Sequence, residues 1–488
     1  MSGYDEKERP EMLRIEDLRR ASGLGLIVAG TAATIGVIYG YDLANIAGAL
    51  LFITKEFHLS TVGQSVVTTA VVVGEVLGAI VGGPMANAIG RKRAMLLLSI
   101  CYTVFAILGA VSVSLTMLVA VRFLLGLTVG ISVVVAPVFV AESSPAQIRG
   151  ALLVLYQVAT VVGIIIAYLV DFALARSGNW RLMLGLAAIP AVAISLVLIR
   201  VPDTSRWYLM KGRREEARRS LSRVDPEIDV ERELDSIQQE MRSERGGQLT
   251  EMLRTPYLRA TVFVVGLGFF IQITGINSIV YYSPLIFKAM GFTGNFSLLI
   301  LPALVQFASL IAVIISLSLV DRLGRRPILL TGIAIMILAN VLLMVVFALG
   351  KVGGGLTALG FMGILLFTVG FTFGFGALVW VYAGESFPSR LRTLGAGAML
   401  TSDLVANVIV SAVFLVVLNT LGGVGTFGIF LVLAALALVF VFKLAPETKG
   451  RPLEAIRFYW ENGGRWPEPT SSTPNPESPR IPESTDDQ

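Results

Sequence analysis

Charged side chains are scarce in this 488-residue chain, and cysteine and histidine are almost absent. Asp, Glu, Lys and Arg make up 15% of the residues, whereas soluble globular domains usually contain about 25%. Cys101 is the only cysteine and His58 the only histidine, so no internal disulfide and no zinc site built from Cys and His can form. The sequence therefore predicts no metal site and no cofactor.

Patterns that carry catalysis or bind nucleotides are also missing. The chain contains no recognisable nucleophile–base constellation and no Gly-Lys-Ser/Thr phosphate loop. We therefore expect neither an enzyme nor ATP-driven transport by this chain alone. A pI near 9.3 is compatible with nucleic-acid binding, but the basic residues lie between apolar stretches, where membrane topology explains them better. No nucleic-acid partner is expected.

Apolar residues dominate the composition. They make up 55% of the chain, and the mean hydropathy of +0.76 is typical of an integral membrane protein surrounded by lipid. The 49 glycines fit close contacts between membrane helices. Twelve apolar stretches are long enough to span a bilayer: residues 24–53, 62–88, 94–114, 116–141, 150–172, 181–200, 257–288, 297–320, 327–349, 357–383, 393–418 and 425–444.

The twelve stretches fall into two groups of six, separated by a polar segment. This pattern predicts an all-α membrane protein with two pseudo-symmetric halves. A charged, polar start without an apolar core favours a cytoplasmic tail over a signal peptide. The expected parts are an N-terminal tail (1–22), an N-terminal half (23–200), a helical linker (201–255), a C-terminal half (256–445) and a tail (446–488) that is disordered beyond about 461.

Lysine and arginine are distributed unevenly between the loops. The loops on the side of the two termini contain Arg91-Lys92-Arg93, Arg325-Arg326 and the basic linker 201–255, whereas the opposite loops contain few basic residues. Because basic loops stay in the cytoplasm, we expect both termini and the linker to be cytoplasmic. The expected location is the plasma membrane, which in bacteria is the inner membrane.

Residues 271–284 bring polar groups into an apolar stretch. Gln272 and Asn277 carry amides at membrane depth, where they must face other helices or a water-filled cavity. On an ideal helix Asn277 and Tyr281 share a face, and Gln272 points roughly 140° away. Gly275 permits local unwinding, so the pattern favours a broken helix that binds a hydroxyl-rich solute. Polar contacts that merely join helices explain these residues equally well.

Two motifs recur in both halves. Residues 89–92, after the second span, have a counterpart in residues 321–326 after the eighth. Residues 142–145, after the fourth span, are answered by residues 385–388 after the tenth. Two repeated halves form the arrangement in which a central cleft can open to either side in turn.

Taken in order along the chain, the motifs resemble those of the sugar porters of the major facilitator superfamily. The resemblance extends over roughly residues 24–455. It rests on Gly40-Tyr41-Asp42, Gly90-Arg91-Lys92, Ala141-Glu142 with Arg149-Gly150, Pro202-Asp203-Thr204-Ser205-Arg206-Trp207, Gln272 with Gly275-Ile276-Asn277 and Tyr281-Tyr282, Asp321 to Arg326, and Pro446-Glu447-Thr448-Lys449-Gly450.

The resemblance implies a sugar site built mainly by the C-terminal half. It nominates Gln157, Gln272, Asn277, Tyr281 and Trp380 as substrate-binding residues. Amides donate and accept hydrogen bonds with hydroxyls, and an indole packs on the apolar face of a sugar ring. Taken alone, Trp380 is better explained by ordinary packing.

The pocket departs from the family pattern at several positions. The paired glutamines of the family are Ile271-Gln272 here, and Asp403-Leu404 stands where glucose facilitators have Asn-Trp. Asp403 is a candidate sugar ligand, because carboxylates accept strongly from hydroxyls, although a role outside binding is equally compatible. The preferred sugar is therefore not assigned.

Asp42 is the residue that bears on energy coupling. The resemblance implies that bacterial proton symporters carry aspartate here and that Arg122 accompanies it, whereas facilitators carry asparagine. Burial favours the protonated form of a carboxyl group and a nearby arginine favours the ionised form, so the proton on Asp42 can depend on conformation. A static ion pair of Asp42 with Arg122 is the alternative.

Further charged residues lie in or beside the spans. Glu75, in an apolar run, could tune a proton path, but a protonated carboxyl that bonds a neighbouring carbonyl explains it more simply. Six residues resemble the family's cytoplasmic charge network, which would hold the inner ends of the halves together: Arg91, Glu142, Arg149, Arg325, Glu385 and Arg392. The alternative is that these charges reflect only the usual excess of basic residues in cytoplasmic loops.

The sequence thus predicts a transporter that imports a monosaccharide by proton symport through alternating access, as a monomer. Two alternatives stay open. One is a proton-independent facilitator, or an exporter of another small solute. The other is a membrane sugar sensor that binds without transport, although the soluble parts contain no recognisable signalling module.

Overall fold

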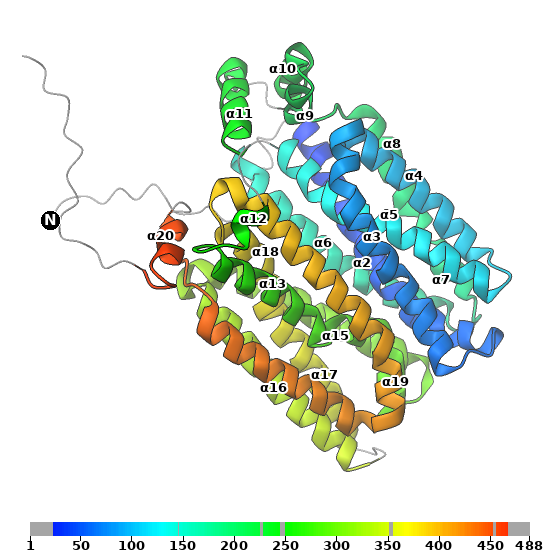
Figure 1. Cartoon of the computed structure of the whole chain (residues 1–488). Coiled ribbons are helices and arrows are strands. Elements are labelled where there is room, and N and C mark those ends of the chain that lie inside the picture. Colours follow the sequence, from blue (N-terminus) through cyan, green and yellow to red (C-terminus); the bar gives the residue numbers. More distant parts are fainter. Residues whose placement is uncertain are drawn as a thin grey trace, which may run out of the picture.

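In the computed structural model, the regular elements are all helices over the described residues, which are 23–144, 146–224, 228–244, 249–350, 355–451 and 455–466. The helices lie side by side in one bundle, with a group of short helices at one end (Figure 1). We call the end that carries these short helices of the linker the insert end, and the opposite end the far end. The N-terminal tail, residues 1–22, lies outside the described residues.

The six predicted spans of the N-terminal half are all helical. Pro84 and Pro137 lie inside two of these helices without ending them, as adjacent helices allow in a membrane bundle. The elements are α2 (Gly23–Glu56), α3 (Thr61–Ile89), α4 (Arg91–Ala110), α5 (Leu115–Glu142), α6 (Ala146–Leu174) and the pair α7 (Trp180–Gly185) and α8 (Ala188–Arg200), which together form the sixth span.

The C-terminal half contains broken and bent spans. Its elements are α13 (Leu258–Ile273), α14 (Ile276–Ala289), η1 (Phe296–Ile300), α15 (Leu301–Leu323), α16 (Arg325–Ala348), α17 (Gly355–Phe371), η2 (Thr372–Gly376), α18 (Ala377–Glu385) and α19 (Ser389–Leu444). The last two predicted spans form the single element α19. Gly422 leaves the helical conformation with φ 66°, and the chain reverses there (Figure 1).

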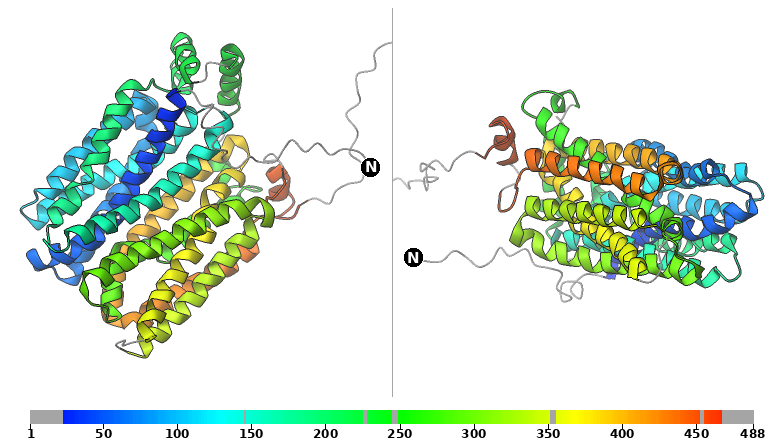
Figure 2. Two further views of the ribbon diagram at one scale, coloured as in Figure 1. Left: turned by 180° about the vertical axis from the view of Figure 1, so that it is seen from behind. Right: turned by 90° about the horizontal axis from the view of Figure 1, so that it is seen from below.

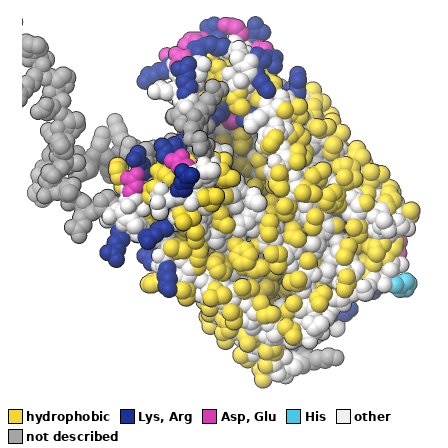
Figure 3. All heavy atoms as spheres, viewed as in Figure 1, with side chains coloured by type: hydrophobic (Ala, Val, Ile, Leu, Met, Phe, Trp, Pro, Cys, Tyr) yellow, Lys and Arg dark blue, Asp and Glu magenta, His cyan; other side chains and the backbone are white. Residues whose placement is uncertain are grey.

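The polar linker forms four short helices at the insert end: α9 (Ser205–Met210), α10 (Arg214–Val224), α11 (Val230–Glu244) and α12 (Leu249–Met252). Arg214 of α10 pairs with Glu231 at 2.7 Å and Asp235 at 2.8 Å, both on α11. These carboxylates raise the pKa of the Arg214 guanidinium. Charged side chains gather over this end of the molecule, and hydrophobic ones cover the bundle (Figure 3).

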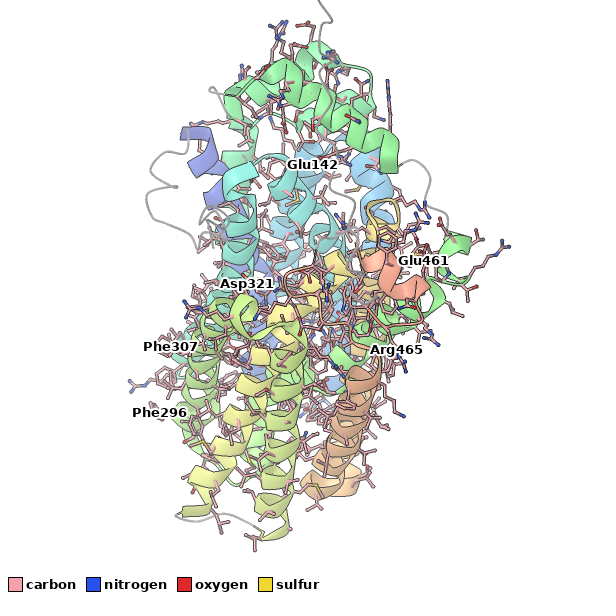
Figure 4. The ribbon with its side chains drawn as sticks, turned by 90° about the vertical axis from the view of Figure 1, so that its left-hand side faces the viewer. Glu142, Phe296, Phe307, Asp321, Glu461 and Arg465 are labelled. Carbon is pink, nitrogen blue, oxygen red and sulfur yellow. The ribbon has the colours of Figure 1, made fainter. Side chains whose placement is uncertain are left out.

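The two halves lie beside each other (Figure 2). They meet mainly where α2 packs on α14, α3 on α19, and α6 on η1 and α15. Phe296 and Phe307 lie on the outer surface of the bundle, where they are 59% and 54% exposed (Figure 4). Such apolar exposure is expected of a surface that contacts lipid.

Glycine lets helices within one half pack at backbone distance. A Cβ on Gly126 of α5 would lie 1.9 Å from the carbonyl oxygen of Val71 on α3. A Cβ on Gly40 of α2 would lie 1.8 Å from the carbonyl oxygen of Thr160 on α6. Because no side chain fits at these contacts, each pair of helices is locked in register.

The chain after α19 packs back onto the insert end through residue 466, beyond the point where the sequence predicts disorder. It includes α20 (Ile456–Glu461). The indole of Trp460 donates to the carbonyl of Ser386 at 2.9 Å, and that of Trp466 donates to the carbonyl of Glu447 at 3.0 Å. The aromatic side chains therefore anchor the segment, and residues 467–488 lie outside the described part.

Candidate functional site

The seventh span is broken at the residue that the sequence indicates. Helix α13 ends at Ile273, and α14 begins at Ile276. Gly275 between them has φ 104°, and the ring of Phe430 lies 2.3 Å from the place of its missing Cβ. Only glycine fits this conformation and this contact. The predicted break is therefore confirmed, and it turns the residues on either side of Gly275 in different directions.

Gln272 meets Asp403 at this break. The amide Nε2 of Gln272 donates to Oδ2 of Asp403 at 3.3 Å, which joins α13 to α19 across the C-terminal half. The amide oxygen Oε1 of Gln272 is buried without a hydrogen-bond partner in the described structure. A buried acceptor without a donor is costly, so this atom is suited to accept a hydrogen bond from a bound hydroxyl.

Tyr281 is held by a residue that the sequence reasoning missed. Its hydroxyl oxygen accepts a hydrogen bond from Nδ2 of Asn407 at 3.3 Å. Both side chains are almost fully buried, and Oδ1 of Asn407 has no partner in the part of the chain that the structure describes. Asn407 follows Asp403 by four residues, so the two share one face of α19. That spacing is the signal that could have identified it.

The other proposed ligands are not tied into this network. Gln157 of α6 and Asn277 of α14 are half-buried. Trp380 of α18 is 49% exposed. The explanation by ordinary packing, which the sequence alone favours for Trp380, would require a more buried side chain. The structure thus brings together Gln272, Asp403 and, through Asn407, Tyr281.

Asp42 and Arg122 are both buried in the N-terminal half. Oδ1 of Asp42 accepts a hydrogen bond from the hydroxyl of Tyr102 at 3.3 Å. Arg122 lies close enough to interact electrostatically with Asp42, but its Nε donates to the carbonyl of Val67 at 3.0 Å, and no direct ion pair joins the two in the described structure. The static ion pair is therefore absent from this conformation. Tyr102 was not identified from the sequence.

Glu75 lies deeper than the sequence suggests. Its side chain is 1% exposed, and Oε1 has no hydrogen-bond partner among the described residues. Asp42 and Asp403 lie within electrostatic range of it. The structural explanation of Glu75 requires its protonated carboxyl group to bond a neighbouring carbonyl, and Oε1 makes no such bond in the described structure.

The charge network of the N-terminal half lies at the insert end. Nε of Arg91 lies 3.0 Å from Oε2 of Glu142, and the hydroxyl of Thr204 donates to that same oxygen at 2.6 Å. Oδ1 of Asp203 accepts the backbone N–H of Arg91 at 3.0 Å, which caps the start of α4. The linker is thereby fixed to the N-terminal half.

The C-terminal half repeats this arrangement. Nη2 of Arg325 lies 3.2 Å from Oε1 of Glu385, and the hydroxyl of Thr448 donates to Oε2 of the same carboxylate. Oε1 of Glu447 accepts the backbone N–H of Arg325 at 3.1 Å. Pro446-Glu447-Thr448 is thus the counterpart of Pro202-Asp203-Thr204, an equivalence that the sequence analysis did not recognise.

No ion pair of the described residues at the insert end joins the two halves directly, but the linker pairs with both, through Arg206 with Glu142 and through Glu251 with Arg390 of α19. Figure 4 shows Glu142 in the N-terminal half below the insert and Asp321 at the corresponding end of the other half. Nε of Arg392 has no partner among the described residues. Arg149 lies in the first turn of α6, which begins at Ala146, but its side chain lies outside the described part.

The far end, by contrast, is joined across the halves. Nδ2 of Asn419 donates to the hydroxyl of Thr61 at 2.9 Å, and the hydroxyl of Tyr168 donates to the carbonyl of Val280 at 2.7 Å. The rings of Phe172 and Phe296 also meet edge to face, with centroids 6.2 Å apart. This conformation is closed at the far end.

The family described as "Sugar (and other) transporter" matches residues 28–460. The chain belongs to this family. The galactose-proton symporter of Escherichia coli (strain K12) is 33% identical over 439 residues, which cover 90% of this chain and 95% of that protein. The arabinose-proton symporter of the same strain is 33% identical over 443 residues, covering 90% of this chain and 94% of that protein.

A solved structure of the xylose transporter XylE from E. coli, in a partially occluded inward open conformation, matches with a TM-score of 0.77. The two chains are 23% identical, and the match covers 88% of this chain and all of that one. At this identity the likeness shows the fold alone. The predicted twelve-helix major facilitator fold and the predicted family are therefore confirmed, and the protein is a multi-pass membrane transporter.

Proposed function

We propose that this protein imports a monosaccharide together with protons by alternating access. The proposal depends on one observation. Asp42 and Arg122 are both buried in the N-terminal half and are not joined by a direct ion pair in the described structure. A carboxyl group released from its arginine can hold a proton. The family match and the relatives named as sugar–proton symporters support this function.

The sugar site is proposed to lie at the broken seventh span. Gln272 and Asp403 offer an amide and a carboxylate from two helices, and Tyr281 with Asn407 offers a phenol and a second amide. The free acceptors on Gln272 and Asn407 favour a ligand rich in hydroxyl groups. Gln157, Asn277 and Trp380 remain predicted contacts that close on the sugar in another conformation.

The transport cycle follows from the two ends of the molecule. In this conformation contacts across the halves close the far end, and the charge pairs at the insert end lie within each half. We infer that Arg91, Glu142, Arg325 and Glu385, with Arg149 and Arg392, exchange partners across the halves when the protein opens at the far end. The halves then rock around the central site.

The proton supplies the energy for accumulation. A proton that binds Asp42 from outside enters with the sugar and leaves on the cytoplasmic side. One proton crossing about 100 mV provides about 2.3 kcal/mol, enough for roughly a fiftyfold sugar gradient. In the proposed orientation the linker, both termini and the charged end of the molecule lie in the cytoplasm. We further propose that the protein resides in the plasma membrane and acts as a monomer.

The experiment is uptake of a panel of labelled monosaccharides into proteoliposomes, with and without an imposed pH gradient. Wild type should accumulate at least one sugar only when the outside is acidic. Asp42→Asn should abolish accumulation while sugar exchange persists. Asp171→Asn is the matched control, because Asp171 is also a buried carboxyl group of the N-terminal half but accepts the backbone N–H of Gly48.

Each alternative gives a different result. A facilitator equilibrates sugar without accumulation, and Asp42→Asn leaves its flux unchanged. A sensor binds sugar with no flux at all. Movement of an unrelated solute, with no sugar transported, would contradict the proposed substrate class.

A further inference from the structure

Three carboxyl groups of the described molecule are linked electrostatically through Glu75, and two of them, Asp42 and Glu75, interact with Arg122. They come from three helices: Asp42 from α2, Glu75 from α3 and Asp403 from α19. Glu75 interacts electrostatically with both other acids and with Arg122 of α5. The remaining titratable neighbours of Glu75 are tyrosines from α2, α6 and α14: Tyr39, Tyr156 and Tyr281.

Tight helix packing fixes the position of Glu75. A Cβ on Gly130 of α5 would lie 2.1 Å from the carbonyl oxygen of Glu75. A Cβ on Gly74 of α3 would lie 2.2 Å from the carbonyl oxygen of Phe123 on α5. Since these backbones touch, α3 cannot turn to move the carboxyl group into lipid or water. Glu75 therefore stays in the centre of the protein.

Hydrogen bonding separates Glu75 from the other two acids. Asp42 accepts from Tyr102, and Asp403 accepts from Gln272. Oε1 of Glu75 is buried and has no partner in the described structure. An ionised carboxylate needs several donors, whereas a protonated one needs fewer, so the surroundings of Glu75 fit the neutral acid.

A charge count leads to the same conclusion. Asp42 and Glu75 share the single guanidinium of Arg122, and Asp403 adds negative charge near Glu75. Ionising Glu75 as well as Asp42 would leave a negative charge without a counter-charge among buried groups, which is strongly disfavoured. Asp42 has the hydroxyl of Tyr102 as a donor, whereas Oε1 of Glu75 has no donor in the described structure, so the cluster favours the neutral form of Glu75.

We propose that Glu75 carries a second proton through the transport cycle, so that two protons enter with each sugar. The proposal rests on the proposed proton symport and extends it. A proton from outside converts the carboxylate of Glu75 into the acid, which is the form that its buried surroundings fit in this conformation. The same proton leaves to the cytoplasm when further opening at the insert end lets water reach Glu75. Asp403 belongs to the other half, so its distance from Glu75 changes as the halves rock, and this couples protonation to movement.

The test is the proton-to-sugar stoichiometry of purified protein in proteoliposomes, with the membrane potential clamped at zero. At a pH difference of one unit, two-proton coupling accumulates sugar about 100-fold at equilibrium and one-proton coupling about tenfold. We expect about 100-fold for wild type and for Glu75→Asp, and about tenfold for Glu75→Gln. Asp171→Asn, a buried acid outside the cluster, should match wild type.

Two results would overturn the role of Glu75 and leave symport intact: about tenfold accumulation by wild type, or unchanged accumulation by Glu75→Gln. No accumulation by wild type at any pH difference would instead refute symport itself. If Glu75→Gln fails to fold, the protons taken up by wild type when sugar binds decide the matter. Two support the proposal, and one contradicts it.

Discussion

The proposed role of Asp403 in sugar binding follows from the residues that surround it in the structure. In the sequence it is one acid in an apolar stretch, equally compatible with sugar binding and with another role. In the structure the Gln272 amide reaches it from a helix more than a hundred positions away. A carboxylate and an amide that share a hydrogen bond, each with further bonding capacity, form a compact binding unit for a vicinal pair of hydroxyls.

Gln272→Ala tests this unit. The change removes the donor to Asp403 and an acceptor available to the sugar. A hydrogen bond to a charged group contributes about 1.5–3 kcal/mol, so we expect the KM for sugar uptake to rise by about 10-fold to 150-fold. The sensitivity of uptake to the pH gradient should persist, because Asp42 is untouched.

Asn340→Ala provides the comparison for this variant. Asn340 is a fully buried amide of α16 that forms no hydrogen bond with any described residue. Its loss should alter thermal stability without changing the KM. An unchanged KM in Gln272→Ala would remove Gln272 from the sugar site.

At the scale of single residues, sequence reasoning identified amides and acids but not all their partners. Gln272, Asp42 and Glu75 stand out because polar groups in apolar stretches are rare. Tyr102 and Asn407 do not, since tyrosine is common in membrane helices and Asn407 looks like one polar residue among many. Only spatial proximity shows that Tyr102 donates to Asp42.

Helices α3 and α5 illustrate how elements position the site. Their glycines allow backbone contact, and that contact places Glu75 and Arg122 in one cluster. The glycine content of the sequence favours such packing in general. It does not say which pairs of helices use it, because partners are chosen by the whole bundle.

Gly126→Ala should destabilise this contact. The new Cβ would lie 1.9 Å from the carbonyl oxygen of Val71, a backbone atom that cannot move aside without shifting the helix. Overpacking of this kind costs about 1–3 kcal/mol. We expect a lower melting temperature of the purified protein in detergent and a weaker pH dependence of uptake.

Gly397→Ala in α19 is the control. The place of its Cβ is open, with no atom of another part of the described chain within 4 Å. Alanine also favours a helix over glycine by about 1 kcal/mol, so this variant should melt at the wild-type temperature or above it. A Gly126→Ala protein as stable as Gly397→Ala would show that the close packing at Gly126 is not required.

At the scale of the whole molecule, contacts between the halves differ at the two ends. The far end is joined by Thr61 with Asn419 and by Tyr168 with the backbone of Val280. At the insert end each half instead holds its own charges, through Arg91 with Glu142 in one half. A molecule that closes at one end while its charge network is divided at the other is suited to rock between two openings.

A crosslink across the far end should arrest this movement. We expect Thr61→Cys/Asn419→Cys, made in a Cys101→Ser background, to be joined by a short bifunctional thiol reagent, since the native side chains lie 2.9 Å apart. The crosslinked protein should lose uptake almost completely because its far end cannot open. A cleavable reagent should allow recovery after reduction.

Each single-cysteine variant, treated with the same reagent, controls for modification alone and should keep its uptake. The extent of crosslinking is measured by the shift of the band on a gel. Full uptake by a completely crosslinked protein would contradict alternating access through this end.

The amino-acid sequence by itself determined the membrane class, the twelve spans, the two-fold repeat and the break at Gly275. These follow from apolar length, charge bias and the special backbone of glycine, which act locally along the chain. The family followed from motifs whose order is itself a property of the sequence. The reversal at Gly422 lies between the predicted spans 393–418 and 425–444. The anchoring of residues 462–466 was less predictable, because neighbouring elements set it.

Only the tertiary structure decided which of these residues act together. It placed Glu75 among Asp42, Arg122 and Asp403, joined Gln272 to Asp403, and separated Arg122 from a direct ion pair with Asp42. The physical reason is that charge and hydrogen bonding depend on distance between side chains, and residues from five helices meet in one buried place only when the two halves pack together.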